Sequence, residues 1–148
     1  MGMIQRTQLD DDVGCFARSM RTAAEQAAIT GRTLAVVIEV TDGFYTVYEA
    51  NSDNDYGEDA NMILERQSLD RCYIDEIDFE DGTHQYSGEL ILQVTSQGWT
   101  AGVVLNLIDL HEHRRYVRFE RQRPRVTVAH EMLYLPEPRS EVSMNTPL

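Results

Sequence analysis

The segment from Val13 to Tyr48 constrains the fold most, because it joins an alanine-rich amphipathic helix directly to a β-hairpin. Its apolar residues recur at spacings of three and four, which places them on one stripe of a 3.6-residue helix. Asp10, Asp11 and Asp12 lie at the helix start, where carboxylates cap free amides, and Gly31 is a typical C-cap. The stripe is mostly alanine, so its packing partner must approach closely. It comprises Val13, Phe16, Ala17, Met20, Ala24, Ala27 and Ala28.

The residues after the helix predict a tight hairpin. Asp42-Gly43 is the pair that a two-residue type I′ turn favours, and such a turn places Val40 opposite Tyr45. The other face of the first strand carries Ala35 and Val37, so it is partly apolar too. We therefore expect the helix to cover one face of this strand and further sheet to cover the other. The inward alternation of this strand is Leu34, Val36, Ile38 and Val40.

The rest of the chain has the pattern of short strands separated by turns. Asp81-Gly82, Gln97-Gly98 and the HEHR segment mark turns, and no repeat of fixed period is present. One long helix packed on antiparallel sheets is an α+β fold. Strands are expected over Met62–Gln67, Cys72–Phe79, Leu90–Thr95, Val103–Leu110, Tyr116–Arg121 and Arg125–His130.

This order of elements resembles the soluble part of the minor pseudopilins of type II secretion systems. It is similar also to the related FimT-type minor pilins of type IV pili and DNA-uptake machinery. The run from Phe16 to Arg32 resembles the family's helical segment, and Gly98 before two late strands resembles its closing strands. The resemblance extends from Asp10 to about Glu131. It implies a pilin-like fold and a structural subunit that assembles with other pseudopilins or pilins and contacts secreted cargo.

Members of this family begin with a basic leader, a cleavage site and an apolar helix of about 20 residues that anchors them in the inner membrane. This chain begins MGMIQRTQLDDD, and its longest apolar run is Leu34–Ile38. We expect that the anchor has been removed and that Met1-Gly2 is a cloning remnant. The resemblance then implies a head domain in the periplasm. We expect a flexible N-terminus over residues 1–9, the globular domain over 10–135 and a disordered tail over 136–148.

Charge and motifs argue against an enzyme. The net charge is −12, with 20 acids and 6 arginines in residues 1–110 (−14) but 5 acids and 7 arginines in residues 111–148 (+2). An acidic body disfavours non-specific binding to nucleic acid or membrane surfaces. No nucleophile elbow, Walker loop or dinucleotide-binding glycine pattern is present, so we expect no catalysis and no cofactor.

An arginine cluster near the C-terminus supports an alternative function, DNA binding by a minor pilin of an uptake filament. Arginines on adjacent strands bind phosphates, and Tyr116 and Phe119 among them could stack on bases. The competing interpretation is a strand face whose arginines pair with the body's carboxylates. Gln122 and Pro124 stand where a glycine would match the family pattern. The cluster is Arg114, Arg115, Arg118, Arg121, Arg123 and Arg125, and all but Arg115 are candidate contacts for nucleic acid or a partner.

Two segments have the residue types of metal sites. The acidic loop from Asn51 to Asp59 resembles a calcium loop, but its glycine falls one place late. Asp109, His111 and His113 would share one face of an extended strand, yet they occupy a predicted hairpin loop. We therefore expect solvated surface at both segments, and at His130-Glu131, and no metal site.

The only two cysteines are expected to be free thiols. Cys15 lies on the helix face that carries Ser19 and Thr22, opposite the apolar stripe, whereas Cys72 belongs to a predicted core strand. Thiols that point in such different directions are not placed to form a disulfide.

Overall fold

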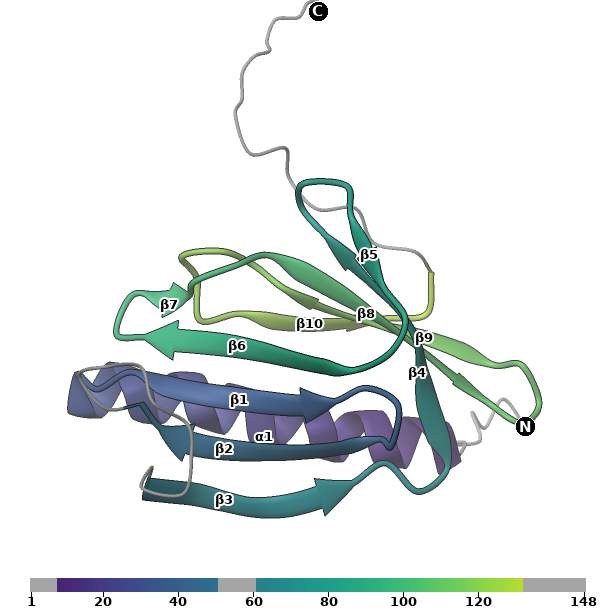
Figure 1. Cartoon of the computed structure of the whole chain (residues 1–148), viewed down its shortest axis with the longest axis horizontal. Helices are drawn as coiled ribbons and strands as arrows, with labels where there is room; N and C mark the ends of the chain where they lie inside the picture. Colours follow the sequence, from purple (N-terminus) through teal and green to yellow (C-terminus); the bar gives the residue numbers. More distant parts are fainter. Residues whose placement is uncertain (1–7, 51–60, 132–148) are drawn as a thin grey trace, which may run out of the picture.

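Helix α1 runs from Gln8 to Thr30 and is the only helix in residues 8–50 and 61–131, the parts that the computed structural model describes (Figure 1). It begins before Asp10, so Asp10 and Asp11 lie inside its first turn, near the positive end of the helix dipole. Gly31 ends the helix as predicted: its φ is 71°, and its amide donates a 2.9 Å hydrogen bond to the carbonyl of Ala27.

The predicted stripe of α1 is buried except at Ala28, which is exposed. Two residues outside the prediction, Leu9 and Ala23, also belong to the core. At about 100° per residue, Ala28 lies about 80° around the axis from Met20, whereas Ala27 lies about 20° away. The full buried set is Leu9, Val13, Phe16, Ala17, Met20, Ala23, Ala24 and Ala27.

Two antiparallel five-stranded sheets complete the described part of the chain (Figure 1). The predicted α+β fold class, one long helix packed on antiparallel sheets, is thereby confirmed. The first sheet has the order β3 (Asn61–Ser68), β2 (Phe44–Glu49), β1 (Leu34–Glu39), β6 (Glu89–Thr95) and β7 (Gly98–Trp99). The second has the order β10 (Val126–Ala129), β9 (Arg114–Phe119), β8 (Val103–Asp109), β4 (Cys72–Phe79) and β5 (His84–Gln85).

All six strands predicted beyond the hairpin are present; Cys72–Phe79 matches at both ends, and no other end shifts by more than two residues. The largest shift at a strand start is in β9, which begins at Arg114 instead of Tyr116. The two-residue strands β5 and β7 were not predicted. The expectations for residues 1–7, for the acidic loop 51–60 and for the tail after residue 131 lie outside the described residues.

The register of the first hairpin differs from the prediction by two residues. Ile38 pairs with Tyr45 and Glu39 with Phe44, so the loop has four residues, Val40 to Gly43, and not two. The amide of Gly43 donates to the carbonyl of Glu39 at 2.8 Å, and Gly43 has a φ of 72°. A slip of two residues leaves every side chain on the same face of the strand, so the predicted inward alternation survives.

Both sheets pack against α1 through aromatic contacts. The ring of Phe16 makes edge-on contacts with Tyr45 of β2, at 5.0 Å between centroids, and with Phe119 of β9, at 6.2 Å. Phe119 in turn makes an edge-on contact with Trp99 of β7, at 4.7 Å. The core therefore lies between the helix and the inner faces of the two sheets.

The expectation of a sheet over the second face of β1 is wrong. Ala35 is buried on that face, but Val37 is only half-buried, and its partner Ile91 on β6 is 40% exposed. The second sheet packs instead on the side of α1. Its apolar strand β8 is buried along its whole length, so covering β8 removes more apolar surface from water than covering the second face of β1 would.

Strand β7 connects the two sheets. The amide of Trp99 donates to the carbonyl of Arg123 at 3.0 Å, and the amide of Gln122 donates to the carbonyl of Trp99 at 2.6 Å. Gly98 allows this approach: it has a φ of 111°, and a Cβ there would lie 2.3 Å from the carbonyl carbon of Arg123. No side chain fits at this crossing.

We expect Gly98→Ala to lower the free energy of unfolding by at least about 3 kcal/mol, because the added methyl group collides with backbone and strains a positive φ. Urea denaturation measures the loss. Gly31→Ala is the matched control, since Gly31 also has a positive φ but meets nothing within 4 Å. That substitution should cost only about 1–2 kcal/mol, and equal losses for both variants would contradict the close crossing.

Candidate interaction surface

Strand alternation divides the arginine cluster between two faces of β9. Arg114, Tyr116 and Arg118 point to one face, while Arg115 shares the other with the buried Val117. The remaining arginines lie in the connection between β9 and β10 and are exposed. The predicted cluster is thus not one continuous surface.

Arg115 belongs to the structural framework. Its guanidinium binds both carboxylate oxygens of Asp10 on α1, with Nε to Oδ1 at 2.7 Å and Nη2 to Oδ2 at 3.3 Å. Its side chain is only 11% exposed, so this two-point ion pair is shielded from water. It fastens the first turn of the helix to the second sheet.

Arg114 and Arg118 are both paired on the outer face. Arg114 donates from Nη1 to Asp75 and to Asn106, each at 3.0 Å, and the hydrogen bond to Asp75 raises the pKa of Arg114 above its ordinary value. Arg118 donates to Glu120 at 3.2 Å. Carboxylates from β4 and from the end of β9 therefore neutralise this part of the surface.

The three arginines after β9 are the most accessible. Arg121 pairs with Glu80 at 3.3 Å, and Arg123, 65% exposed, is 3.8 Å from Glu120. Arg125 makes no ion pair with any described residue. Arg118, Arg121 and Arg123 thus share two carboxylates, Glu80 and Glu120, and Arg125 adds a fourth positive charge. The result is a small positive patch on an acidic protein. Whether this patch binds nucleic acid or a partner stays a prediction.

Gln122, which stands where a glycine would match the pattern of the FimT-type pilins, has a backbone conformation typical of glycine. Its φ is 61°, a left-handed conformation for which glycine is the usual residue. The chain therefore makes the turn that a glycine would make, although the residue type differs.

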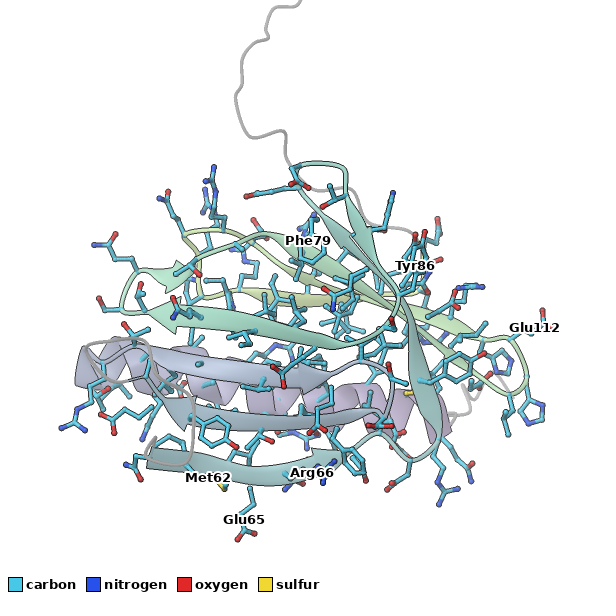
Figure 2. All side chains as sticks on the ribbon, viewed as in Figure 1. Met62, Glu65, Arg66, Phe79, Tyr86 and Glu112 are labelled. Atoms are coloured by element: carbon cyan, nitrogen blue, oxygen red, sulfur yellow. The ribbon has the colours of Figure 1, made fainter. Side chains whose placement is uncertain are left out.

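The Asp109–His113 segment is a turn and not an extended strand. Oδ1 of Asp109 accepts hydrogen bonds from the amides of His111 and His113, both at 2.9 Å, and Oδ2 lies 3.0 Å from Nδ1 of His113. Burial alone would raise the pKa of Asp109, but these hydrogen bonds outweigh it, and the pKa is lowered. The carboxylate closes the β8–β9 turn, whose tip carries Glu112 (Figure 2).

The two thiols lie in different environments. Cys15 is exposed on α1, and Cys72 is buried at the start of β4, and both are free. The Sγ of Cys72 is 3.6 Å from Oδ2 of Asp12. The same oxygen accepts a hydrogen bond from the backbone amide of Arg71 at 2.5 Å.

Strand β3 is an exposed sheet edge. Met62 and Ile63 are 48% and 43% exposed, and Figure 2 shows Met62 and Glu65 projecting from this strand away from the rest of the sheet. Arg66 instead reaches back over the ring of Phe44 and pairs with Glu39 of β1 at 3.1 Å. A groove of about 340 Å³ lies between α1 and the strands β2 and β3. Residues that line it include Cys15, Ser19, Tyr45, Ile63 and Gln67. Exposed edge strands are surfaces to which other chains can add.

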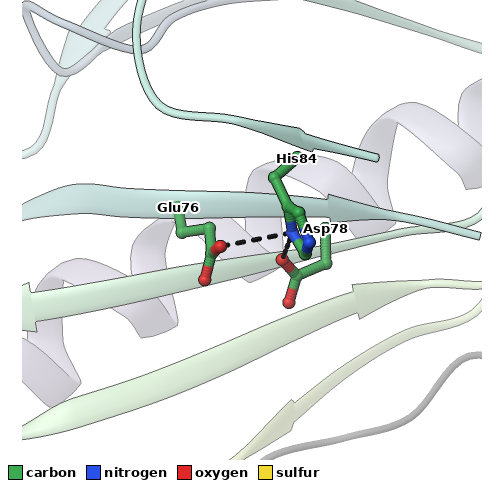
Figure 3. Close-up of side chains that lie close together, drawn as sticks. All are labelled: Glu76, Asp78 and His84. Carbon is green, nitrogen blue, oxygen red and sulfur yellow. Dashed lines mark hydrogen bonds and ion pairs between the residues drawn. The ribbon is translucent and has the colours of Figure 1, made fainter. Parts of the chain in front are cut away.

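One group of possible ligands escaped the sequence analysis. Glu76 and Asp78 of β4 and His84 of β5 place three ligand atoms within 4.8 Å of one another (Figure 3). The signal in the sequence was a pair of acids two residues apart, followed across an Asp-Gly turn by a histidine. It was missed because β5 was not predicted.

Comparison with known proteins supports the fold class but does not assign a family. No family model and no curated protein sequence matches the chain significantly. Among solved structures, the fold is similar to that of a minor pseudopilin, which confirms the pilin-like fold expected from the sequence. The similar structure is the minor pseudopilin EpsH from the type 2 secretion system of Vibrio cholerae, at 15% identity and a TM-score of 0.56. The match covers 83% of this chain and 97% of that chain.

No helix in the described part of this chain has both the length and the apolar character needed to cross a bilayer.

The Asp10–Arg115 pair generates a stability prediction. Arg115→Met keeps most of the apolar stem but removes both hydrogen bonds from the guanidinium to a half-buried carboxylate, so we expect a loss of about 1–3 kcal/mol in the free energy of unfolding. Arg123→Met removes an exposed arginine and should change it by less than about 0.5 kcal/mol. Chemical denaturation of the two variants compares them, and equal effects would show that the pair does not fasten the helix.

Proposed function

We propose that this protein is a structural minor pseudopilin or pilin, a subunit of a type II secretion or type IV pilus-like filament. It acts by assembly and protein–protein contacts and not by catalysis. The observation that carries the proposal is the arrangement of one N-terminal helix against two antiparallel sheets, shared with a minor pseudopilin over 97% of that chain.

The surface features are consistent with such a role. The exposed edge strand β3, with Met62 and Ile63, and the adjacent groove offer contact area to neighbouring subunits or cargo. Asp109 and His113, the most suggestive catalytic pair in the sequence, are engaged in closing a turn. In the cell, the head would lie in the periplasm on an inner-membrane anchor that precedes the residues of this chain.

Deletion of the gene in its own host tests the proposal. A pseudopilin deletion should abolish secretion of the system's extracellular cargo and leave DNA uptake unchanged. The intact gene and a gene carrying Arg121, Arg123 and Arg125 changed to Gln should both restore secretion, because these three side chains are exposed and lie outside the core. Two results together would contradict the proposal: normal secretion in the deletion strain, and recovery of the protein from the soluble cytoplasmic fraction of the parent strain.

A DNA-binding minor pilin of an uptake filament is the second candidate, favoured by the exposed Arg121, Arg123 and Arg125. Under the first proposal, DNA binding to the purified protein should be no tighter than ~10⁻⁴ M at physiological salt. Under the second, affinity is micromolar, falls with salt and is lost in the triple Gln variant. A matched variant with Arg18, Arg32 and Arg66 changed to Gln loses the same charge elsewhere, so it separates a specific patch from net charge in a fluorescence-anisotropy titration.

A further inference from the structure

We propose that Glu76, Asp78 and His84 form a binding site for a zinc-like divalent transition-metal ion on the β4–β5 hairpin. Nδ1 of His84 lies 2.6 Å from Oδ1 of Asp78 and 3.2 Å from Oε2 of Glu76 (Figure 3). Four-coordinate zinc, with bonds of about 2.0–2.2 Å, holds its ligands about 3.4 Å apart. The two spacings from Nδ1 lie within about 0.8 Å of that value, and all three ligand atoms lie within 4.8 Å of one another, so small movements of these side chains would complete the geometry.

A β-bulge in β4 creates this face. The pairing with β8 shifts between Ile74 and Glu76, so Asp75 is an extra residue. Before the bulge the even-numbered Cys72 and Ile74 are buried, and after it the odd-numbered Ile77 is buried. The bulge therefore turns Glu76 and Asp78 away from the core.

The β5 strand brings the third ligand into register. His84 is the partner of Asp78 across the β4–β5 pair, so both side chains project from the same face. Side-chain hydrogen bonds close the connecting turn. Oδ1 of Asp81 accepts one from the amide of Thr83 at 2.9 Å and one from its hydroxyl at 2.6 Å. Gly82 completes the turn with a φ of 89°. The site is thus held by structure present before an ion arrives.

The charges around the site leave a place for a cation. The neighbouring acids are neutralised, since Asp75 pairs with Arg114 and Glu80 with Arg121. Glu76 and Asp78 have no arginine partner among the described residues, and their cation is His84 when it is protonated. Two carboxylates and a dication make a neutral site. The phenol of Tyr86 hydrogen-bonds to Glu76, as groups around a metal site commonly do to its ligands.

The chemical types of the three ligands indicate which ions the site would bind. One imidazole and two carboxylates suit zinc and similar transition metals, with an open position toward solvent. Calcium takes six to eight oxygen ligands and disfavours imidazole, so this site should not bind it.

A proton competes with the metal for His84. The hydrogen bond to Asp78, helped by the charges of Asp78 and Glu76, raises the pKa of His84 above its ordinary value. The ionisable groups that surround this face also include Asp75 and Tyr86. Because zinc binds only the neutral imidazole, affinity should increase as the pH rises through the raised pKa of His84 and fall below it.

Isothermal titration of the untagged, EDTA-treated protein with ZnCl₂ tests the site. We expect one ion per chain, a dissociation constant in the micromolar range, and no signal with CaCl₂. His84→Ala and Asp78→Asn should each weaken binding by about tenfold or more. His111→Ala and Cys15→Ser should leave the affinity unchanged, since they remove ligand-type side chains outside the site.

Absence of zinc binding to the intact protein would overturn the proposal, as would full binding to the folded His84→Ala variant. Circular dichroism in EDTA checks that each variant folds, and Glu76→Gln supplies the same comparison if another variant does not. Amide NMR shifts during the titration should be confined to β4, β5 and their turn; shifts centred on the β8–β9 turn would place the ion elsewhere.

Discussion

The contacts of Phe16 are the interaction on which the arrangement of layers depends. Its ring touches Tyr45 of one sheet and Phe119 of the other, and the two sheets meet again where Trp99 touches Phe119. Each edge-to-face pair contributes about 0.5–1.5 kcal/mol beyond the burial of its surface. The alanines that surround Phe16 on α1 let both sheets approach the helix backbone, so one short stripe organises the whole core.

Much of this arrangement could be predicted from the sequence, because periodicity reports burial directly. The helix and the six later strands have clear patterns, and the predicted stripe wrongly included only Ala28, although it left out Leu9 and Ala23. The hairpin register was less predictable, because Asp42-Gly43 fits both a two-residue loop and the end of a four-residue loop. Strands β5 and β7 have two residues each and exist through distant pairing, such as Trp99 with Arg121 to Arg123. No local pattern encodes such contacts.

The candidate surfaces were harder to predict than the fold. Residue types and strand alternation located the arginine cluster, but three of the four acids that pair with it come from distant segments. These are Asp10 from α1, and Asp75 and Glu80 from β4 and its end; the fourth, Glu120, is local. The proposed metal site depends on a bulge at Asp75, which reverses the facing of Glu76 and Asp78. A strict period of two through β4 would have placed these acids on the same face as Ile74, inside the protein.

The environment of Cys72 has a consequence for chemical modification. Burial, together with the nearby carboxylates of Asp12 and Asp109, raises the pKa of this thiol to about 12. The thiolate is the nucleophile in alkylation and oxidation, so Cys72 is inert in the folded protein at neutral pH. Cys15 is exposed on the outer face of α1. A maleimide dye or spin label therefore attaches at one native position, beside the groove formed with β3, without any substitution in the chain.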